Sequence, residues 1–437
     1  MREIIIVDDL APEAVAMVQA LYSRDPKSVK THLVQVREKG AEKFMASYYV
    51  GYGHKSIGDC GTTSIFVENV SMLVTKAVQD WPLYNGQEAS TRYLDMAAQT
   101  VMDPIDTPES RAIQNEWMRF YRHALTALVP ALKERFPIKE GEKEPVYEKA
   151  IKARAFDIAR GFLPAGVTTF AAWHTNLRQA YDHVKEMRHH PLAEVRETAE
   201  LIRTSLRERY PSSFSHKEYP TEEEYLEKSM AEFAYFDDDE AVKGFSYRST
   251  LDIDGLRRHA DLLALRPPKA ELHQRLRQYG NIEFSFPLDF GSYRDLQRHR
   301  SMVQEMPLLT TRHGFYGWYL EQLPPELRAE AERVLAEQEK RIAALRMAGG
   351  SPVSDIVRQY YIAMGYTVAV KITGPLPAAV YTAELRSSDT VHPTLRVQAQ
   401  RMGDAIREAV PGIAMHHDTS PGTWNIKRGN HDIVRKE

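Results

Sequence analysis

The 437-residue chain contains one cysteine, Cys60, and this scarcity excludes several kinds of protein. A single cysteine forms neither an intrachain disulfide framework nor a cysteine-built zinc site, and such a composition is usual in a reducing compartment. The adjacent histidine pairs at residues 189–190 and 416–417 lack the i, i+4 spacing that puts two metal ligands on one helix face. We therefore predict a cytoplasmic protein with no metal centre, in which both histidine pairs are solvent-facing turn residues.

Long apolar runs and an excess of one charge are also missing. No apolar stretch approaches the roughly 20 residues that cross a bilayer, and the amino terminus lacks the apolar core of a signal peptide. The 57 basic and 60 acidic residues nearly cancel, so no overall field attracts a nucleic acid, although a local basic pocket can bind a mononucleotide. We predict a soluble protein with no membrane contact and no nucleic-acid partner.

Helical periodicity dominates the rest of the sequence. Apolar residues recur at helical spacing from Ser110 to Phe136, and Pro137 closes this run. Further helical patterns cover residues 147–162, 177–188, 193–209, 325–347, 354–364 and 394–409, whereas strand-like patterns cover Glu3–Val7, Thr63–Val70 and Ile282–Leu288. These patterns predict an α+β protein with a modest sheet packed by helices.

The chain also contains an internal repeat. The segment that begins at Thr168 leads to Arg188 after twenty residues, and the segment that begins at Tyr366 leads to Arg386 after the same interval. Each arginine is followed by a His-Pro pair and by a helix that ends near a proline. A period of about 200 residues indicates a duplicated domain.

An acidic passage within residues 211–240 reads as a solvated helix and connector between the two copies. We therefore predict a first domain over residues 1–215, an acidic connector over residues 216–244, and a second, more diverged domain over residues 245–437.

A glycine-bounded turn near residue 54 presents an imidazole, a hydroxyl and a carboxylate within six residues. Through His54, Ser56 and Asp59 such a turn can hold polar groups of a cofactor. The alternative is structural, with Ser56 or Asp59 capping a helix and His54 as a partly buried hydrogen-bonding residue.

Polar residues alternate in the segment Gln87–Tyr93, so an extended chain would point Glu88, Ser90 and Arg92 to one face. That face suits a phosphorylated ligand, because arginine grips phosphate bidentately, serine donates a hydroxyl hydrogen bond and glutamate accepts one. The alternative is a solvated Glu–Arg pair on an edge strand.

Three arginines and a histidine gather within residues 294–300, with Arg294 and Arg298 on one face if the segment is helical. Forked guanidinium donors there favour an anion such as pyrophosphate, whereas the alternative is an ordinary surface cluster. Asn176 and Arg188 lie on or near another helical stretch, where the asparagine can cap the helix. The arginine either faces a cleft or pairs with acidic neighbours.

These motifs fall in a known order, and the sequence resembles the flavin-dependent thymidylate synthases. That family has a GHxS–E turn, an Arg-His-Arg signature followed by Asn-Glu-x-Ser-x-Arg-Tyr, and a distal Asn-x-Arg helix. Within about residues 20–210 the chain has GHKSIGD, QEASTRY and FLPAGVTTFAAWHTNLRQAYDHVKEMR. Asp-Trp-Pro at residues 80–82 replaces the Arg-His-Arg of the first half, whereas the second half keeps Arg-His-Arg at residues 298–300 but lacks a GHxS turn.

The resemblance implies a noncovalent FAD, reduced by NADPH, that mediates transfer of a one-carbon unit from methylenetetrahydrofolate to C5 of dUMP or a related pyrimidine mononucleotide. The residues that it implies for nucleotide contact are Glu88, Ser90, Arg92, Tyr93 and Arg188. Those that it implies for FAD contact are His54, Ser56, Asp59, Asn176, Arg298, His299 and Arg300.

Members of this family are homotetramers with active sites between subunits. We therefore expect two tandem domains arranged as a pseudo-dimer, each a small sheet packed by several helices, and a homodimer equivalent to the family tetramer. The alternatives are a non-catalytic nucleotide-binding or scaffold homologue, and a flavoenzyme with a different substrate.

Overall fold

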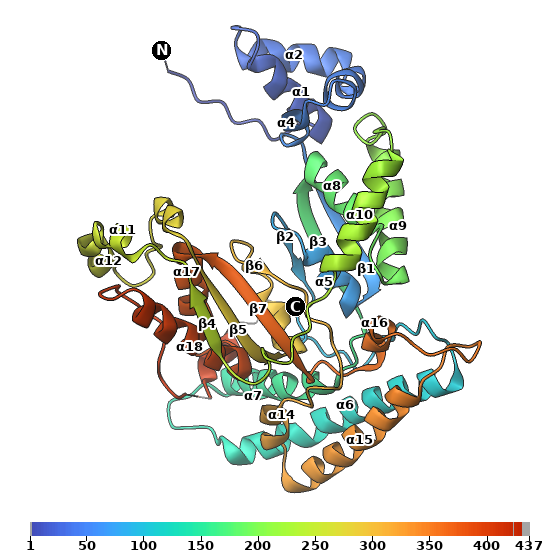
Figure 1. Cartoon of the computed structure of the whole chain (residues 1–437), viewed down its shortest axis with the longest axis vertical. Coiled ribbons are helices and arrows are strands. Elements are labelled where there is room, and N and C mark those ends of the chain that lie inside the picture. The colour runs from blue at the N-terminus through green and yellow to red at the C-terminus, as the bar shows by residue number, and fades with distance from the viewer. Residues whose placement is uncertain (1, 423, 431–437) are drawn as a thin grey trace. The chain divides into compact units, whose positions relative to one another are not determined.

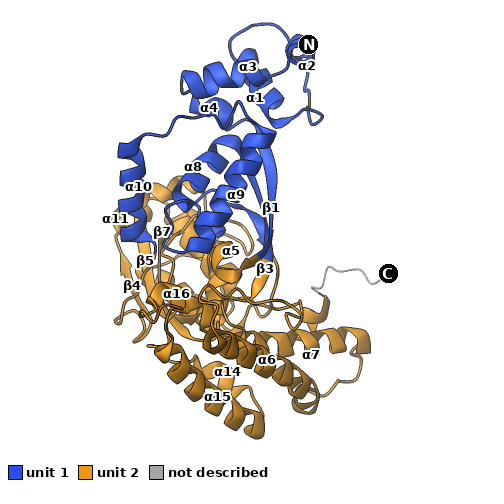
Figure 2. Cartoon of the chain, turned by 90° about the vertical axis from the view of Figure 1, so that its right-hand side faces the viewer, with its two compact units in different colours: residues 1–69, 77–88, 170–234 blue, residues 70–76, 89–169, 235–437 orange. Residues whose placement is uncertain are grey.

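The computed structural model describes residues 2–422 and 424–430, which form two compact units (Figure 2). Unit 1 contains Met1–Asn69, Ala77–Glu88 and Phe170–Ala234, and unit 2 contains Val70–Lys76, Ala89–Thr169 and Tyr235–Glu437. The units alternate along the chain, whereas the predicted domains follow one another. The compact units are defined by packing, whereas the predicted domains are defined by duplication in the sequence. The two divisions therefore need not coincide, and the predicted domain boundaries stay a prediction.

Unit 1 is built on a three-stranded sheet of order β1-β3-β2, with most of β1 (Thr62–Ser71) and β3 (Thr168–Asn176) and all of β2 (Asn85–Glu88). Figure 1 shows α8 and α9 beside this sheet. The helices of this unit are α1 (Pro12–Tyr22), α2 (Val29–Lys39), α3 (Glu42–Phe44), a π-helix (Met45–Gly51), α4 (Lys55–Gly58), α8 (Leu177–Met187), α9 (Ala193–Arg209) and α10 (Pro220–Phe233). The end of α5 (Met72–Gln79) also belongs to unit 1, whereas its beginning belongs to unit 2.

Unit 2 is built on a four-stranded antiparallel sheet of order β4-β5-β7-β6, with strands Ser246–Ser249, Asn281–Asp289, Thr367–Pro375 and Val303–Gln304. Its helices are α6 (Pro108–Arg135), α7 (Glu144–Ala159), α11 (Ile253–Arg257), α12 (Ala260–Leu265), α13 (Phe290–Leu296), α14 (Gly317–Glu321), α15 (Pro325–Ala344), α16 (Asp355–Arg358), α17 (Leu376–Arg386) and α18 (Pro393–Ala409). Short 3₁₀ turns cover Arg160–Phe162, Gln274–Tyr279, Gln359–Tyr361 and Ile426–Asn430.

Alternation along β5 explains how the unit 2 sheet is buried. Ile282, Phe284, Phe286 and Leu288 are fully buried at every second position of this strand. Burying each such side chain contributes about 1.5–3 kcal/mol. The pattern predicted as a strand over Ile282–Leu288 is therefore confirmed.

The long amphipathic helix is confirmed as α6, which begins after the capping box of Thr107 and Ser110. The patterns over residues 177–188, 193–209 and 394–409 likewise correspond to α8, α9 and α18. The chain is thus a mixed α and β protein with two small sheets and many helices.

Two predicted elements are wrong. Glu3–Val7 forms no strand, and Ile4 and Ile6 stay 89% and 87% exposed because no neighbouring strand covers them. The helix predicted over residues 354–364 stops at Arg358 and passes through a 3₁₀ turn. The residues that follow pair with another segment instead.

That pairing is reciprocal. Ala165 N–H donates to the carbonyl of Ile362 at 2.9 Å, and Met364 N–H donates to the carbonyl of Leu163 at 2.8 Å. Donor and acceptor segments exchange roles between the two bonds, and the interval from Leu163 to Ile362 equals the interval from Ala165 to Met364. Such an exchange is the local form of a two-fold contact between like surfaces.

Two glycines repeat the same relation. Gly166 N–H donates to the carbonyl of Tyr360 at 3.0 Å, and Gly365 N–H donates to that of Gly161 at 2.7 Å. A Cβ atom would lie 2.6 Å from the Tyr360 oxygen at the first position and 2.7 Å from the Gly161 oxygen at the second. Both positions therefore require glycine for a close backbone approach.

The spacing of elements also repeats along the chain. The interval from the end of β1 to the end of β5 equals the interval from the start of α5 to the start of α13, and that from the start of β2 to the start of β6. The intervals from β3 to β7 and from α8 to α17 are likewise equal to each other, and they are shorter because α15 and α16 are shorter than α6 and α7. The structure therefore matches Thr168 with Thr367. The sequence repeat had matched Thr168 with Tyr366, which is one residue earlier.

Candidate functional site

Four residues predicted to contact a cofactor lie together in unit 1. His54 precedes α4, where its Nδ1 atom lies 3.3 Å from Nη2 of Arg24, and Ser56 lies within that helix. Asp59 follows α4 and accepts a 2.6 Å hydrogen bond from Nε of an arginine in the first turn of α8, Arg178. Asn176 caps α8 by accepting the N–H of Gln179 at 2.8 Å.

Glu88 ends β2 in unit 1, where it is buried and accepts a 2.9 Å hydrogen bond from Nε2 of Gln79. Arg188 lies at the other end of α8 from Asn176. It pairs with carboxylates of Glu200 at 2.6 Å, Glu218 at 3.1 Å and Glu223 at 3.7 Å. Burial opposes its charge, but Glu200 and Glu218 outweigh that effect and raise the pKa of Arg188. Its charge is thus already matched.

The segment of residues 89–93 belongs to unit 2, and it is a turn rather than the predicted extended strand. The N–H groups of Tyr93 and Leu94 both donate to the Ser90 carbonyl, at 3.2 and 2.9 Å. Arg92 N–H also lies 3.3 Å from Oγ of Ser90. Serine favours such local hydrogen bonds over a strand, which ends the alternation at Glu88.

Helix α13 holds this turn in place. The helix begins where Asp289 accepts the N–H of Ser292 at 2.8 Å. Buried Arg294 donates from Nη2 to the carbonyl of Ala89 and from Nη1 to Oγ1 of Thr91, both at 3.1 Å. The two segments are 203 and 205 residues apart in the sequence. This contact brings the turn of residues 90–93 to the helix that precedes residues 298–300.

Arg298 and Arg300 are exposed, and His299 is buried between them. The helix stops at Leu296, so Arg294 and Arg298 do not share the predicted helical face. The Nε2 amide of Gln304 donates a 3.0 Å hydrogen bond to the carbonyl of His299. This bond gives a backbone carbonyl beyond the end of the helix a partner.

His299 is neutral in the structure. Its Nε2 atom accepts Nε of Arg386 at 2.6 Å, and its Nδ1 atom lies 3.1 Å from the Thr382 hydroxyl. Burial and then the Arg386 charge lower the pKa of His299 well below its ordinary value. Only the two exposed arginines of this motif therefore offer positive charge to an anion.

Arg92 is fixed by a fully buried carboxylate. Its Nε donates to Oδ1 of Asp157 at 2.7 Å, and its Nη2 donates to the Thr390 carbonyl at 3.1 Å. Arg428 pairs with the same carboxylate and lies over the ring of Tyr93, 5.5 Å from its centroid. One carboxylate therefore pairs with two guanidinium groups, of which Arg428 is buried and Arg92 is partly buried.

A second carboxylate, Asp295, lies among four arginines. Burial alone would raise the pKa of Asp295, but Arg92, Arg160, Arg386 and Arg298 outweigh it and hold that pKa below its usual range. Its Oδ2 atom lies 3.8 Å from Nη1 of Arg160 and 4.0 Å from Nη1 of Arg92. No hydrogen-bond partner of that oxygen is found among the described residues.

Positive charge is in excess around this carboxylate. Burial, followed by repulsion from Arg160, lowers the pKa of Arg92 even though Asp295 opposes the shift. Burial, followed by repulsion from Arg298 and Arg92, lowers the pKa of Arg386 against the same opposition. Both guanidinium groups would gain from an additional anion. We call Arg92, Asp295, Arg160, Arg298 and Arg386 the arginine cluster.

The polar network beneath the cluster is structural. Thr394 donates to Oδ1 of Asp289 at 2.5 Å, and Tyr319 donates to its Oδ2 at 2.8 Å. Oγ of Ser292 accepts Nη2 of Arg160 at 2.8 Å and lies 3.1 Å from Nδ1 of His392. Ser292, His392 and Asp289 are fully buried, so this trio cannot reach a substrate as a nucleophilic triad.

Three cluster residues were not singled out from the sequence. Arg160 and Asp295 are distant in the sequence, and no short motif joins them. Arg386 was noted only through the repeat, which was the available signal. The prediction that both histidine pairs face solvent was wrong for His190 and His417, which are buried at 7% and 6% exposure, whereas His416 is exposed.

The arginine cluster can bind and orient a compact anion. Arg298, within the cluster, and Arg300 beside it are exposed guanidinium groups whose chemistry fits a diphosphate. In the described part of the chain, no group of three or more His, Cys, Asp or Glu side chains is placed to hold a metal ion. None of its helices is long and apolar enough to cross a membrane.

A pH dependence follows from His183 in unit 1. Burial lowers the pKa of His183 to about 4, and its Nε2 atom lies 3.0 Å from the Val78 carbonyl. An unfolded histidine has a pKa of about 6.5, so the unfolded state binds more protons between these values. The neutral His183 therefore contributes its full stabilisation of the folded state above about pH 6.5. As the pH falls toward 4, the free energy of unfolding decreases by up to about 3 kcal/mol.

Urea denaturation at pH 7 and pH 4.5 measures this effect. We expect His183→Phe to reduce the loss of unfolding free energy at low pH, whereas the exposed His123→Gln leaves it unchanged. An equal pH dependence in wild type and His183→Phe would contradict the neutral, buried state of this imidazole.

The chain is a mixed α and β protein in which an arginine cluster lies beside the turn of residues 90–93. Residues 6–212 match the family described as thymidylate synthase complementing protein, which is the flavin-dependent thymidylate synthase family. These residues are similar to that family, as their motifs predicted.

Relatives extend the similarity beyond residue 212. A UPF0159 protein of Chlamydia pneumoniae is 26% identical over 420 residues, which cover 82% of this chain and 76% of the relative. A UPF0159 protein of Thermoplasma acidophilum is 23% identical over 467 residues, which cover 90% of this chain and 92% of the relative. A UPF0159 protein of Chlamydia muridarum is 25% identical over 417 residues, which cover 82% of this chain and 77% of the relative.

Proposed function

We propose that this protein is a flavin-dependent thymidylate synthase-like enzyme that binds dUMP or a related pyrimidine mononucleotide at the arginine cluster. The observation that carries the proposal is the excess of partly buried positive charge beside the turn of residues 90–93. A nucleotide phosphate supplies the missing negative charge, and Arg92 is already oriented by Asp157 to receive it.

In this proposal Glu88, Ser90, Arg92 and Tyr93 contact the nucleotide, as the family motif implies. Arg188 was predicted to join them, but three carboxylates match its charge. We therefore propose that Arg386, which lies in the cluster, provides the further phosphate contact in unit 2, and Arg188 stays a prediction to be tested beside it.

His54, Ser56, Asp59, Asn176, Arg298, His299 and Arg300 are proposed to hold FAD. When bound, FAD supplies the redox chemistry for reductive one-carbon transfer to C5, with NADPH and methylenetetrahydrofolate as cosubstrates. The side chains of this chain bind and orient the reactants. His299 does so as a neutral group, because Arg386 donates to its Nε2 atom.

The tandem pseudo-dimer, with domains over residues 1–215 and 245–437, is also proposed. The reciprocal bonds between residues 163–166 and 360–365 support it, as does the constant spacing between corresponding elements of the two halves. A homodimer would then correspond to a family tetramer.

The same spacing predicts a single nucleotide site per chain. The interval that relates β2 to β6 matches Glu88, Ser90 and Arg92 with three uncharged residues, which cannot bind a phosphate by charge. These residues are Met306, Leu308 and Thr310. We expect calorimetric titration with dUMP to give one site per chain. Two equal sites would contradict the loss of the second copy.

Activity is tested by reconstitution. The protein is expected to take up FAD, seen as flavin absorbance after gel filtration, and to release tritium from C5-labelled dUMP when NADPH and methylenetetrahydrofolate are present. A protein that binds neither FAD nor dUMP contradicts the proposal.

A specific observation favours a second candidate, a nucleotide-binding homologue without catalysis. Trp81 occupies the place of a family cation, where its Nε1 donates to Gln179 at 2.8 Å and its ring stacks on His183 at 4.7 Å. Binding of dUMP with no flavin uptake would favour this alternative.

A further inference from the structure

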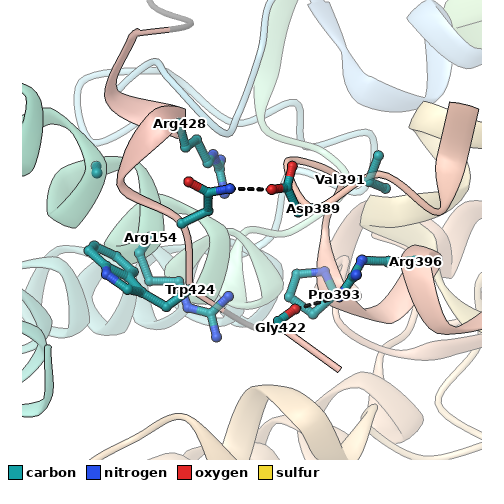
Figure 3. A pocket seen from close by; sticks show the side chains of 10 residues that line it. Arg154, Asp389, Val391, Pro393, Arg396, Gly422, Trp424 and Arg428 are labelled. Atoms are coloured by element: carbon teal, nitrogen blue, oxygen red, sulfur yellow. Dashed lines mark hydrogen bonds between the residues drawn. The ribbon is translucent and has the colours of Figure 1, made fainter. Parts of the chain in front are cut away.

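A second basic pocket lies in unit 2, between α7, the start of α18, Gly422 and residues 424–428. Figure 3 shows Arg154, Arg396 and Arg428 around it, with Trp424 and Asp389 on its wall. The pocket is partly open to solvent. Arg92, Arg298 and Arg386 of the arginine cluster do not line it.

Arg154 is the unusual residue of this pocket. It is 4% exposed, and no carboxylate pairs with it among the described residues. Its Nη2 donates to the neutral side chain of Gln322 at 2.9 Å, its guanidinium lies 4.9 Å from the Trp318 ring centroid, and its Nε has no partner in the described chain. A buried cation without a counter-charge is costly, because burial removes the water that would stabilise it.

The neighbouring charges do not relieve Arg154. Burial, followed by repulsion from Arg135 and Arg92, lowers the pKa of Arg154 to about 10. Arg428 shares Asp157 with Arg92, and its Nε atom is likewise unpartnered in the described chain.

The other groups on the wall are already paired. Arg396 donates to Asp418, Ser420 and the Gly422 carbonyl, so its charge is matched by Asp418. The carboxylate of Asp389 accepts a hydrogen bond from the Asn425 amide. Uncompensated positive charge therefore remains at Arg154 and Arg428. The 17-residue helix α18 also begins at Pro393 on this wall, and a helix N-terminus favours an anion.

We propose that this pocket is a second anion site that binds a phosphoryl oxyanion, either free phosphate or the phosphoryl group of an organic ester. The oxyanion contacts the guanidinium groups of Arg154 and Arg428. Tetrahedral oxygens match these forked donors, and the anion supplies the counter-charge that Arg154 lacks. This site is separate from the one proposed for the pyrimidine nucleotide, although Arg428 and Arg92 share one carboxylate.

The test uses the full chain with inorganic phosphate and ribose 5-phosphate as separate probes in calorimetric and thermal-shift titrations. Arg154→Met removes the unpaired charge, and Val391→Asp places a carboxylate on the pocket wall without removing an arginine. Arg386→Gln is the matched control, because it changes the other site. We expect at least a tenfold loss of affinity in both pocket variants and unchanged binding at the pocket in the control.

The melting temperature separates a binding site from a structural role. Phosphate is expected to raise it in the wild type but not in Val391→Asp, whose ligand-free melting temperature should equal or exceed that of the wild type. Binding of phosphate alone identifies the free anion as the ligand, and binding of ribose 5-phosphate as well identifies the phosphoryl group. Binding of neither probe, or binding whose affinity and stoichiometry are unchanged in both pocket variants, overturns the proposal.

Discussion

Replacing Asp157 with asparagine is expected to lower the free energy of unfolding by about 3–5 kcal/mol, because the buried Arg428 and the partly buried Arg92 lose their shared carboxylate. Asp157 is fully buried, and both Arg92 and Arg428 pair with it. The isosteric amide keeps the volume of the side chain, so the loss comes from charge rather than from a cavity. Urea denaturation followed by tryptophan fluorescence measures the change.

The matched control is Asp254→Asn. Asp254 pairs with Arg257 on the surface, with 87% and 73% of the two side chains exposed in the order named. Exposed pairs contribute about 0–1 kcal/mol, so the control should differ little from the wild type. Equal stability of Asp157→Asn and Asp254→Asn would show that Asp157 does not compensate Arg92 and Arg428.

Arg92→Gln is expected to weaken dUMP binding by about 100-fold, or about 3 kcal/mol, because it removes a partly buried, oriented phosphate donor. Glutamine keeps a hydrogen-bonding group but no charge. The variant also relieves repulsion on Arg386, whose pKa Arg92 helps to lower. Its ligand-free stability should therefore fall much less than that of Asp157→Asn. Calorimetric titration with dUMP gives the affinity.

Two further variants show which other arginine binds the dUMP phosphate together with Arg92. Arg386→Gln should weaken dUMP binding by about tenfold or more, because Arg386 lies in the same under-compensated cluster. Arg188→Gln should have a smaller effect, because three carboxylates match its charge. The exposed Arg328→Gln serves as the neutral control. Unchanged affinity in Arg92→Gln would place the nucleotide elsewhere.

Much of the fold could be predicted because its signals are local. The apolar spacing between Ser110 and Phe136 was enough to predict α6, and alternation was enough to predict β5. The strand predicted at the amino terminus failed because a short apolar run forms a strand only beside a partner, and Ile4 and Ile6 have none to cover them.

The site could be predicted only in part. Motif order located Ser90 and Arg92, but the turn that replaces the extended strand depends on local serine hydrogen bonds. Asp157 and Arg428 are 271 residues apart, and no sequence period links them. Long-range pairs of this kind arise from packing and become visible only in the folded chain.

The central claim is that a pyrimidine nucleotide places its phosphate in the arginine cluster. A crystal structure with 5-iodo-2′-deoxyuridine 5′-monophosphate tests it most directly, because the anomalous signal of iodine fixes the orientation of the base. We expect the phosphate to accept hydrogen bonds from Arg92 and Arg386 in one site per chain. A phosphate bound at Arg188, or at neither arginine of the cluster, would contradict the claim.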